Sequence, residues 1–117
     1  MSKIYLNTRD EMICLCTDLV AYVQAEGNYS TLYYITGKRI ALTFSISKME
    51  IILKEHNNLQ NRFVRLGRSY VVNHRYVFRI ELLHQVLVLS DGRNDDLHVR
   101  MSKQHLKAYK DAIHKKA

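Results

Sequence analysis

Short runs of β-branched and aromatic residues, separated by glycines or polar turns, follow one another along most of this 117-residue chain. Runs of this length are typical of strands joined by tight turns, and they leave little room for long helices. The chain is therefore predicted to be β-dominated, with neighbouring strands paired as hairpins. The predicted strands span residues 4–6, 12–16, 20–25, 32–35, 39–44, 63–66, 70–72, 76–83, 85–89 and 97–99.

Two segments carry apolar residues at helical spacing instead. A first helix is predicted at about residues 46–56, where Ser47 and Glu50 fit a capping box. A second helix is predicted after Ser102, a residue suited to cap a helix N-terminus. Residues 56–61 indicate a polar loop after the first helix. The predicted fold class is mostly β with two helices.

Composition places the chain among small globular domains. Hydrophobic residues make up 47% of the sequence, and residues 1–117 are predicted to form a single domain. No apolar run reaches the roughly 20 residues that span a bilayer, and the N-terminus shows no signal-peptide region, so a cytoplasmic protein is expected. Cys14 and Cys16 are then expected to be buried thiols in a reducing compartment.

The net charge of +7 lies entirely in the second half of the chain. Residues 1–61 contain 6 Lys or Arg and 6 Asp or Glu, which gives a net charge of zero. Residues 62–117 contain 12 Lys or Arg and 5 Asp or Glu, which leaves +7. Such an uneven positive charge indicates a nucleic acid or an anionic membrane as partner, with an ordinary solvated surface as the alternative.

The sequence contains no arrangement of residues that predicts catalysis. It has no nucleophile elbow, phosphate-binding glycine loop or His-Glu-x-x-His helix. The six histidines are scattered singly, and the two cysteines lack a second pair that would complete a zinc site. No metal or cofactor is therefore predicted, and an enzyme is the weakest interpretation.

Three segments carry side chains suited to nucleic acid. In the second loop, defined as residues 65–69, Arg65, Arg68 and Ser69 surround Gly67. Arginine can clamp phosphates or pair bidentately with guanine, and serine can donate to phosphate oxygens. The first loop is residues 26–30, and the third loop is residues 99–103, where a helix N-terminus follows an arginine. Each loop taken alone is also explained by ordinary turn chemistry and capping.

Two of these segments resemble the LytTR family of DNA-binding domains. One segment resembles the family's signature of Phe, Arg, His-Arg-Ser and Val-Asn: Phe63-Val64-Arg65-Leu66-Gly67-Arg68-Ser69-Tyr70-Val71-Val72-Asn73. The family's Tyr-Ile-Glu-Ala-x-Gly-Asn-Tyr-Thr segment is resembled by Tyr22-Val23-Gln24-Ala25-Glu26-Gly27-Asn28-Tyr29-Ser30. Residues 42–53 match the family's short linking helix, and residues 97–106 match its last strand and final helix. The resemblance covers essentially the whole chain.

The resemblance implies an elongated β-sheet domain without a helix-turn-helix, usually the output domain of a bacterial two-component response regulator. Such a domain inserts loops into successive major grooves of double-stranded DNA, and it often binds repeated promoter sites as a dimer. A receiver domain and a sensor histidine kinase are further implied partners, and no receiver domain is expected within this chain. The DNA-facing residues carried over by position are Asn28, Tyr29 and Ser30 in the first loop, Arg65, Arg68 and Ser69 in the second, and Arg100, Ser102 and Lys103 in the third.

The chain departs from the family pattern in two places. Gly67 stands where the signature usually has histidine, so one side-chain contact is missing from the second loop. Arg100 and Met101 stand where the family usually has Ser-Arg. Asn73 matches the signature asparagine, and we expect a structural turn role for it.

Other binding functions stay open on the residues alone. A protein-interaction or dimerisation module without direct DNA binding would use the near-neutral first half, which contains Tyr22, Tyr29, Tyr33 and Tyr34. An RNA-binding module could stack bases on strand tyrosines, although no aromatic and basic strand of the RNP type is present. A sequence-specific DNA-binding transcriptional regulator is the leading hypothesis.

Overall fold

The computed structural model describes residues 2–56 and 62–116, so most of the predicted polar loop lies outside the described residues. Within these ranges the chain is mostly β with two helices, as predicted. The strands are β1 (Lys3–Asn7), β2 (Met12–Cys16), β3 (Val20–Glu26), β4 (Tyr29–Tyr34), β5 (Arg39–Leu42), β6 (Phe63–Leu66), β7 (Tyr70–Asn73), β8 (Val77–Glu81), β9 (Val86–Leu89) and β10 (Leu97–Arg100). The helices are α1 (Ile46–Glu55) and α2 (Lys103–Lys116).

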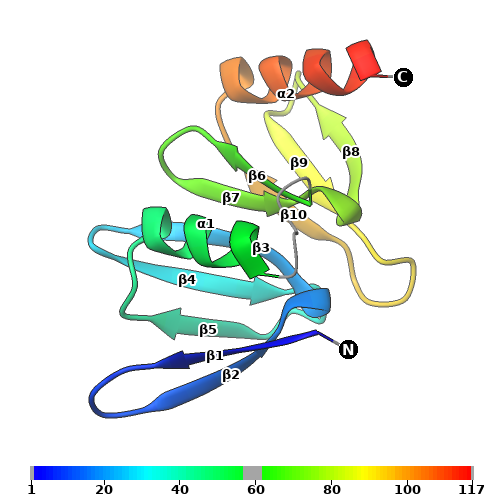
Figure 1. Ribbon diagram of the computed structural model, residues 1–117. Coiled ribbons are helices and arrows are strands. Elements are labelled where there is room, and N and C mark those ends of the chain that lie inside the picture. The colour runs from blue at the N-terminus through cyan, green and yellow to red at the C-terminus, as the bar shows by residue number, and fades with distance from the viewer. Residues whose placement is uncertain (1, 57–61, 117) are drawn as a thin grey trace.

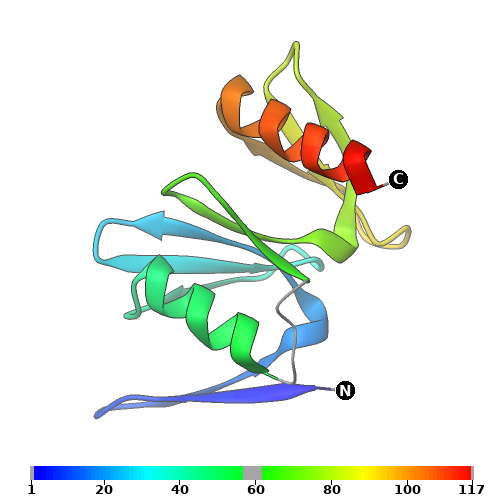
Figure 2. The same cartoon turned by 45° about the horizontal axis from the view of Figure 1, so that its top comes forward.

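Antiparallel pairing organises the strands into three sheets. The central sheet has the order β5-β4-β3-β7-β6, a separate hairpin pairs β1 with β2, and a third sheet has the order β10-β9-β8. The β1–β2 hairpin and α1 lie on one side of the central sheet, and the third sheet and α2 lie on the other (Figures 1 and 2). Stacking of these layers gives an elongated molecule with extents of 43 × 30 × 26 Å.

The two faces of the central sheet form two separate cores. Val23 and Val71 are register partners on neighbouring strands, and both belong to the cluster that includes residues of α1. The next pair along the strands, Tyr22 and Val72, belongs to the cluster that includes residues of α2. Successive side chains of a strand point to opposite faces, so strands buried on both sides must be apolar at nearly every position. This explains the continuous apolar runs in β3 and β7.

Helix α1 begins at Ile46, as predicted, but its capping residue differs from the predicted one. Its N-cap is Ser45, whose hydroxyl accepts a hydrogen bond from the Lys48 N–H at 3.2 Å. The predicted capping box from Ser47 to Glu50 is therefore wrong. Ser47 is exposed within the first turn of α1. The Glu50 carboxylate forms ion pairs with Lys54 and Arg65 and does not accept a hydrogen bond from a backbone N–H of the described residues.

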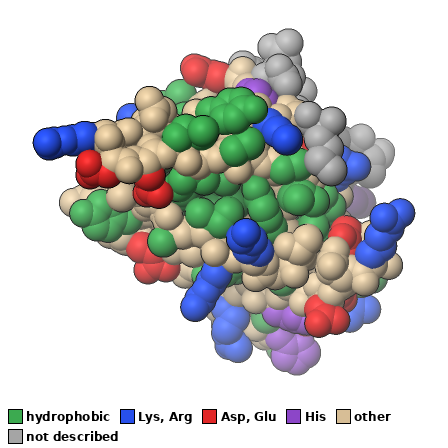
Figure 3. Space-filling model, turned by 90° about the horizontal axis from the view of Figure 1, so that it is seen from below, with side chains coloured by type: hydrophobic (Ala, Val, Ile, Leu, Met, Phe, Trp, Pro, Cys, Tyr) green, Lys and Arg blue, Asp and Glu red, His purple; other side chains and the backbone are tan. Residues whose placement is uncertain are grey.

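The expectation of two buried thiols is also wrong. The β1–β2 hairpin turns Ile4, Leu6 and Leu15 into the core, so its alternate residues face outward. Cys14 is exposed and Cys16 is half-buried. Hydrophobic side chains gather on the underside of the molecule, where this hairpin lies (Figure 3).

The described helices are too short or too polar to cross a membrane.

Candidate nucleic-acid interface

The three predicted loops lie at the same end of the central sheet. The β3–β4 turn, the β6–β7 turn and the start of α2 all point to the left in Figure 1. Two hydrogen bonds from strand residues that flank the loops connect them: the Ala25 N–H of β3 donates to the Ser69 carbonyl at 2.8 Å, and the Tyr70 hydroxyl of β7 donates to the Arg100 carbonyl at 3.0 Å. The first, second and third loops therefore form one connected surface.

The Tyr70 hydroxyl is well suited to this connection. Burial raises the pKa of Tyr70 above its ordinary value, and the nearby Tyr33 and Glu26 side chains raise it further. The hydroxyl therefore keeps its proton at neutral pH and acts as a donor. The acceptor is a backbone oxygen just before α2, so the bond fixes where the third loop begins.

Arg65 holds the second loop in place from the inside. Its Nε donates to the Gly67 carbonyl at 3.0 Å, and its Nη2 donates to the Arg68 carbonyl at 3.0 Å. Its Nη1 donates to Glu50 Oε1 at 2.8 Å, and the Arg65 side chain is only 25% exposed. Every nitrogen of the guanidinium is occupied, so Arg65 fits the role of a brace between the turn and α1.

Glu50 is the anchor of this brace. Burial alone raises the pKa of the Glu50 carboxyl, but hydrogen bonds from Lys54 and Arg65 outweigh it, and the pKa lies below its ordinary value. The carboxylate is therefore charged at neutral pH. It offers Oε1 to Arg65 and Oε2 to Lys54, so both oxygens have cationic donors.

Replacing Arg65 with methionine is expected to destabilise the folded domain. The change removes three hydrogen bonds, one of which is the ion pair with Glu50, while keeping the apolar stem, and we expect a loss of about 1–3 kcal/mol. Urea unfolding followed by circular dichroism measures it. Arg68→Met is the matched control and should leave unfolding unchanged. Equal stability of the two variants would show that Arg65 is not a brace.

Arg68 differs from Arg65 in having an available side chain. It is exposed at the tip of the β6–β7 turn, and its guanidinium has no hydrogen bond or ion pair among the described residues. Ser69 beside it is also exposed, while its carbonyl accepts the bond from the first loop. The second loop therefore presents one free guanidinium and one hydroxyl on a rigid turn.

The first loop is shorter than its sequence suggested, because β4 begins at Tyr29. Asn28 is exposed at the turn, and Tyr29 is 59% exposed. Ser30 is 1% exposed, and its hydroxyl donates to the Phe44 carbonyl at 2.8 Å. Side chains alternate along β4, and Ser30 shares the buried face with Leu32 and Tyr34, so it faces inward.

The third loop carries two further cations. Arg100 and Lys103 are exposed on either side of Met101, which is buried in the core. Ser102 caps α2 as predicted, since its hydroxyl accepts the His105 N–H at 3.3 Å. The loop thus joins an anchored residue to the N-terminus of α2, where free N–H groups and the helix dipole attract anions.

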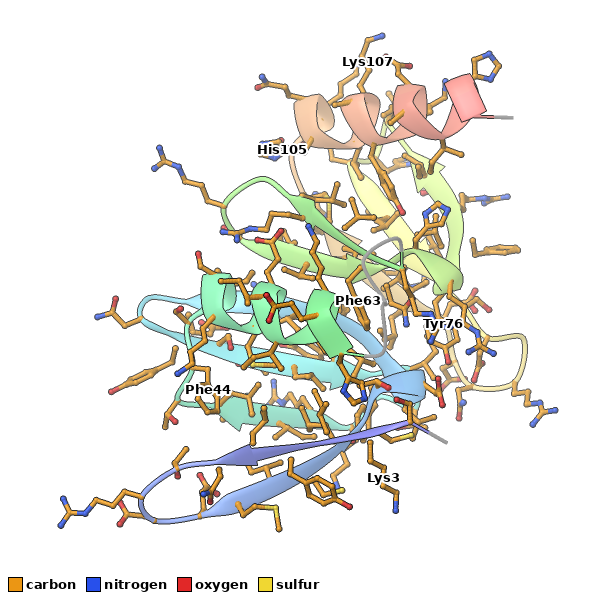
Figure 4. All side chains as sticks on the ribbon, viewed as in Figure 1. Lys3, Phe44, Phe63, Tyr76, His105 and Lys107 are labelled. Atoms are coloured by element: carbon orange, nitrogen blue, oxygen red, sulfur yellow. The ribbon has the colours of Figure 1, made fainter. Side chains whose placement is uncertain are left out.

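Two further residues complete the description of this region. Asn73 is buried in a turn, as expected: its Nδ2 donates to the Val20 carbonyl at 2.8 Å, and its Oδ1 accepts the Arg75 N–H. His105 was not singled out from the sequence, where it is one of several scattered histidines. Its ring lies against Gly67 of the second loop, and Figure 4 shows it at the start of α2. Its spacing of three from the capping Ser102 was the available signal.

Comparisons with known proteins agree with this architecture. The family model of the LytTr DNA-binding domain matches residues 10–114. Among solved structures, the LytTr DNA-binding domain of a response regulator from Bacillus cereus superposes with a TM-score of 0.62. The alignment covers 97% of each chain at 20% sequence identity, so this likeness concerns the fold. No curated protein matches the sequence. The family match spans nearly the whole chain, and the chain belongs to the LytTr DNA-binding domain family.

Proposed function

We propose that this chain is a sequence-specific DNA-binding domain that regulates transcription and reads the major groove through its loops. The observation that carries the proposal is the grouping of Arg68, Arg100 and Lys103. All are exposed, and they stand on loops that hydrogen bonds hold at one end of the central sheet. Fixed cations of this kind suit the regularly spaced phosphates of a duplex.

The loops divide the work of recognition in this proposal. Arg68 reads a base, because a free guanidinium on a rigid turn can pair with guanine O6 and N7. Asn28 and Tyr29 contribute further base or backbone contacts from the first loop. Lys103 and the N-terminus of α2 bind phosphates and set the orientation of the domain. Ser69 and Ser102 can add hydroxyl contacts to phosphate oxygens.

The dimensions of the molecule support contact with more than one groove. Its longest extent is 43 Å, and one turn of B-DNA rises by about 34–36 Å. We propose that two copies bind repeated promoter sites as a dimer. We further propose that the domain acts as the output module of a two-component response regulator, controlled by a receiver domain and a sensor histidine kinase.

The alternative of a protein-interaction module loses much of its basis in this fold. It depended on tyrosines in the first half of the chain. Tyr22 and Tyr34 are each 9% exposed, and the Tyr22 ring stacks on Tyr33 with ring centres 4.4 Å apart. Most of the tyrosine surface therefore stabilises the core, which leaves Tyr29 as the exposed aromatic of that group.

Selection of bound oligonucleotides from a random duplex pool, at stated salt, tests the proposed function. We expect one recovered motif, repeated at a fixed spacing. Log Kobs for that motif should fall linearly with log[salt], by about 0.9 for each phosphate neutralised. Sedimentation on the repeated site should show two copies bound. Recovery of no motif at low salt would contradict sequence-specific binding, and self-association without DNA binding would favour the interaction module.

A further inference from the structure

The His105 imidazole occupies the space that a side chain at position 67 would take. A Cβ built on Gly67 would lie 2.5 Å from His105 Cε1 and 2.9 Å from both ring nitrogens. Non-bonded carbon atoms pack at about 3.5–4.0 Å, so no other residue fits at position 67 while the ring stays in place. Gly67 also has a φ of +63°, a left-handed conformation that favours glycine.

A hydrogen bond to Ser102 fixes the orientation of the ring. The Ser102 hydroxyl accepts the His105 N–H at 3.3 Å and lies 2.9 Å from His105 Nδ1. The hydroxyl can donate its own proton to Nδ1, and in that arrangement the ring carries its proton on Nε2, where it can be donated.

The His105 ring lies against the second loop at Gly67, the residue that precedes Arg68. His105 is exposed, and Nε2 has no hydrogen-bond partner among the described residues. The ring helps to line a groove between β6 and α2, together with Leu66, Ala108 and Tyr109. A purely space-filling role would be met by any small apolar side chain. Here a polar ring nitrogen has no partner among the described residues and lies at the second loop, on the surface proposed to face DNA.

We infer that His105 is a DNA-contacting residue, and that its Nε2–H donates to an acceptor on the duplex, either a phosphate oxygen or a base-edge acceptor such as guanine O6 or N7. This inference rests on the proposed function. Because Gly67 has no side chain, the His105 ring of α2 can occupy the space beside it. His105 therefore takes the place of the histidine that the second loop lacks. The second and third loops then present adjacent donors on a single surface.

A double-mutant cycle on the selected DNA site tests the inference. His105→Ala is expected to weaken binding roughly five- to tenfold, the scale of one hydrogen bond to a nucleic-acid acceptor, with unchanged thermal unfolding. Gly67→Ala should weaken binding in the parent protein because it displaces the ring. Its effect should be smaller in the His105→Ala background, where no ring remains and only the strain of a left-handed alanine is left. His105→Gln keeps a side-chain N–H donor and should recover part of the loss.

His114→Ala is the matched control, since His114 is an exposed histidine on the same helix. It should bind like the parent protein. Single-base-pair variants of the site separate the two acceptors: a base contact relaxes preference at one position, and a phosphate contact weakens all sites equally. Binding of His105→Ala within twofold of the parent, while Arg68→Ala loses affinity, would overturn the inference and leave the proposed function standing. Absence of binding by the parent protein would overturn both.

Discussion

Replacing Arg68 with alanine is expected to weaken binding of the selected DNA site by about 1–3 kcal/mol, which corresponds to roughly 5- to 150-fold in affinity. Arg68 is the exposed arginine at the tip of the second loop, and its guanidinium makes no bond within the described residues. The substitution therefore removes the proposed contact to DNA without removing a contact from the fold. Fluorescence anisotropy titration at fixed salt measures the change.

The design of this experiment separates base reading from general charge. Lys110→Ala is a matched control, because Lys110 is an exposed cation on α2, about two helical turns after Lys103, the first residue of the helix. It removes the same charge and should change affinity little. Loss of preference at one base position in Arg68→Ala indicates base reading, whereas uniform weakening with a shallower salt dependence indicates a phosphate contact. Equal affinities of parent and Arg68→Ala would remove Arg68 from the interface.

Replacing Phe63 with alanine is expected to lower the free energy of unfolding by about 3–5 kcal/mol. Phe63 is 1% exposed and belongs to the cluster beneath α1 that includes Met49 and Leu53 (Figure 4). Truncation removes the ring from a close-packed interior between the central sheet and α1. The surrounding side chains can relax only partly, so a cavity remains. Urea unfolding at neutral pH, analysed as a two-state transition, measures the loss.

Phe78 provides the matched control for this substitution. It is 66% exposed on β8, so Phe78→Ala should change the unfolding free energy by no more than about 0.5 kcal/mol. The comparison holds the chemistry constant and varies only the burial. A loss below about 1 kcal/mol in Phe63→Ala would show that the core around α1 is not packed as described.

Local pattern accounts for most of the elements but not for their detailed ends. β2 was predicted with its observed bounds, and α1 and α2 were placed within a residue or two. The cap of α1 was misplaced because Ser45 and Ser47 are both suitable caps, and only the path of the incoming chain decides between them. The faces of the β1–β2 hairpin were not predictable either. Both contain apolar residues, so Cys14 could not be assigned to the solvent side.

The candidate site was predictable as a set of loops and not as a set of roles. Arg65 and Arg68 flank the same glycine and are equivalent in the sequence. They differ because the Arg65 side chain reaches Glu50, which is fifteen positions earlier in the chain, and the Arg68 side chain does not. The contact between Gly67 and His105 likewise joins different elements. Only tertiary structure brings such residues together, since local spacing carries no information about them.

Four of the hydrogen bonds that hold the three loops share a property of their acceptors. Ala25 and Tyr70 donate to the carbonyls of Ser69 and Arg100, and Arg65 donates to the carbonyls of Gly67 and Arg68. Every one of these acceptors is main chain, and a main-chain oxygen is present whatever residue occupies the position. The side chains at positions 68, 69 and 100 can therefore vary without loosening the frame beneath them. Under the proposed function, changes at the loop tips alter the target sequence while the scaffold that presents them is retained.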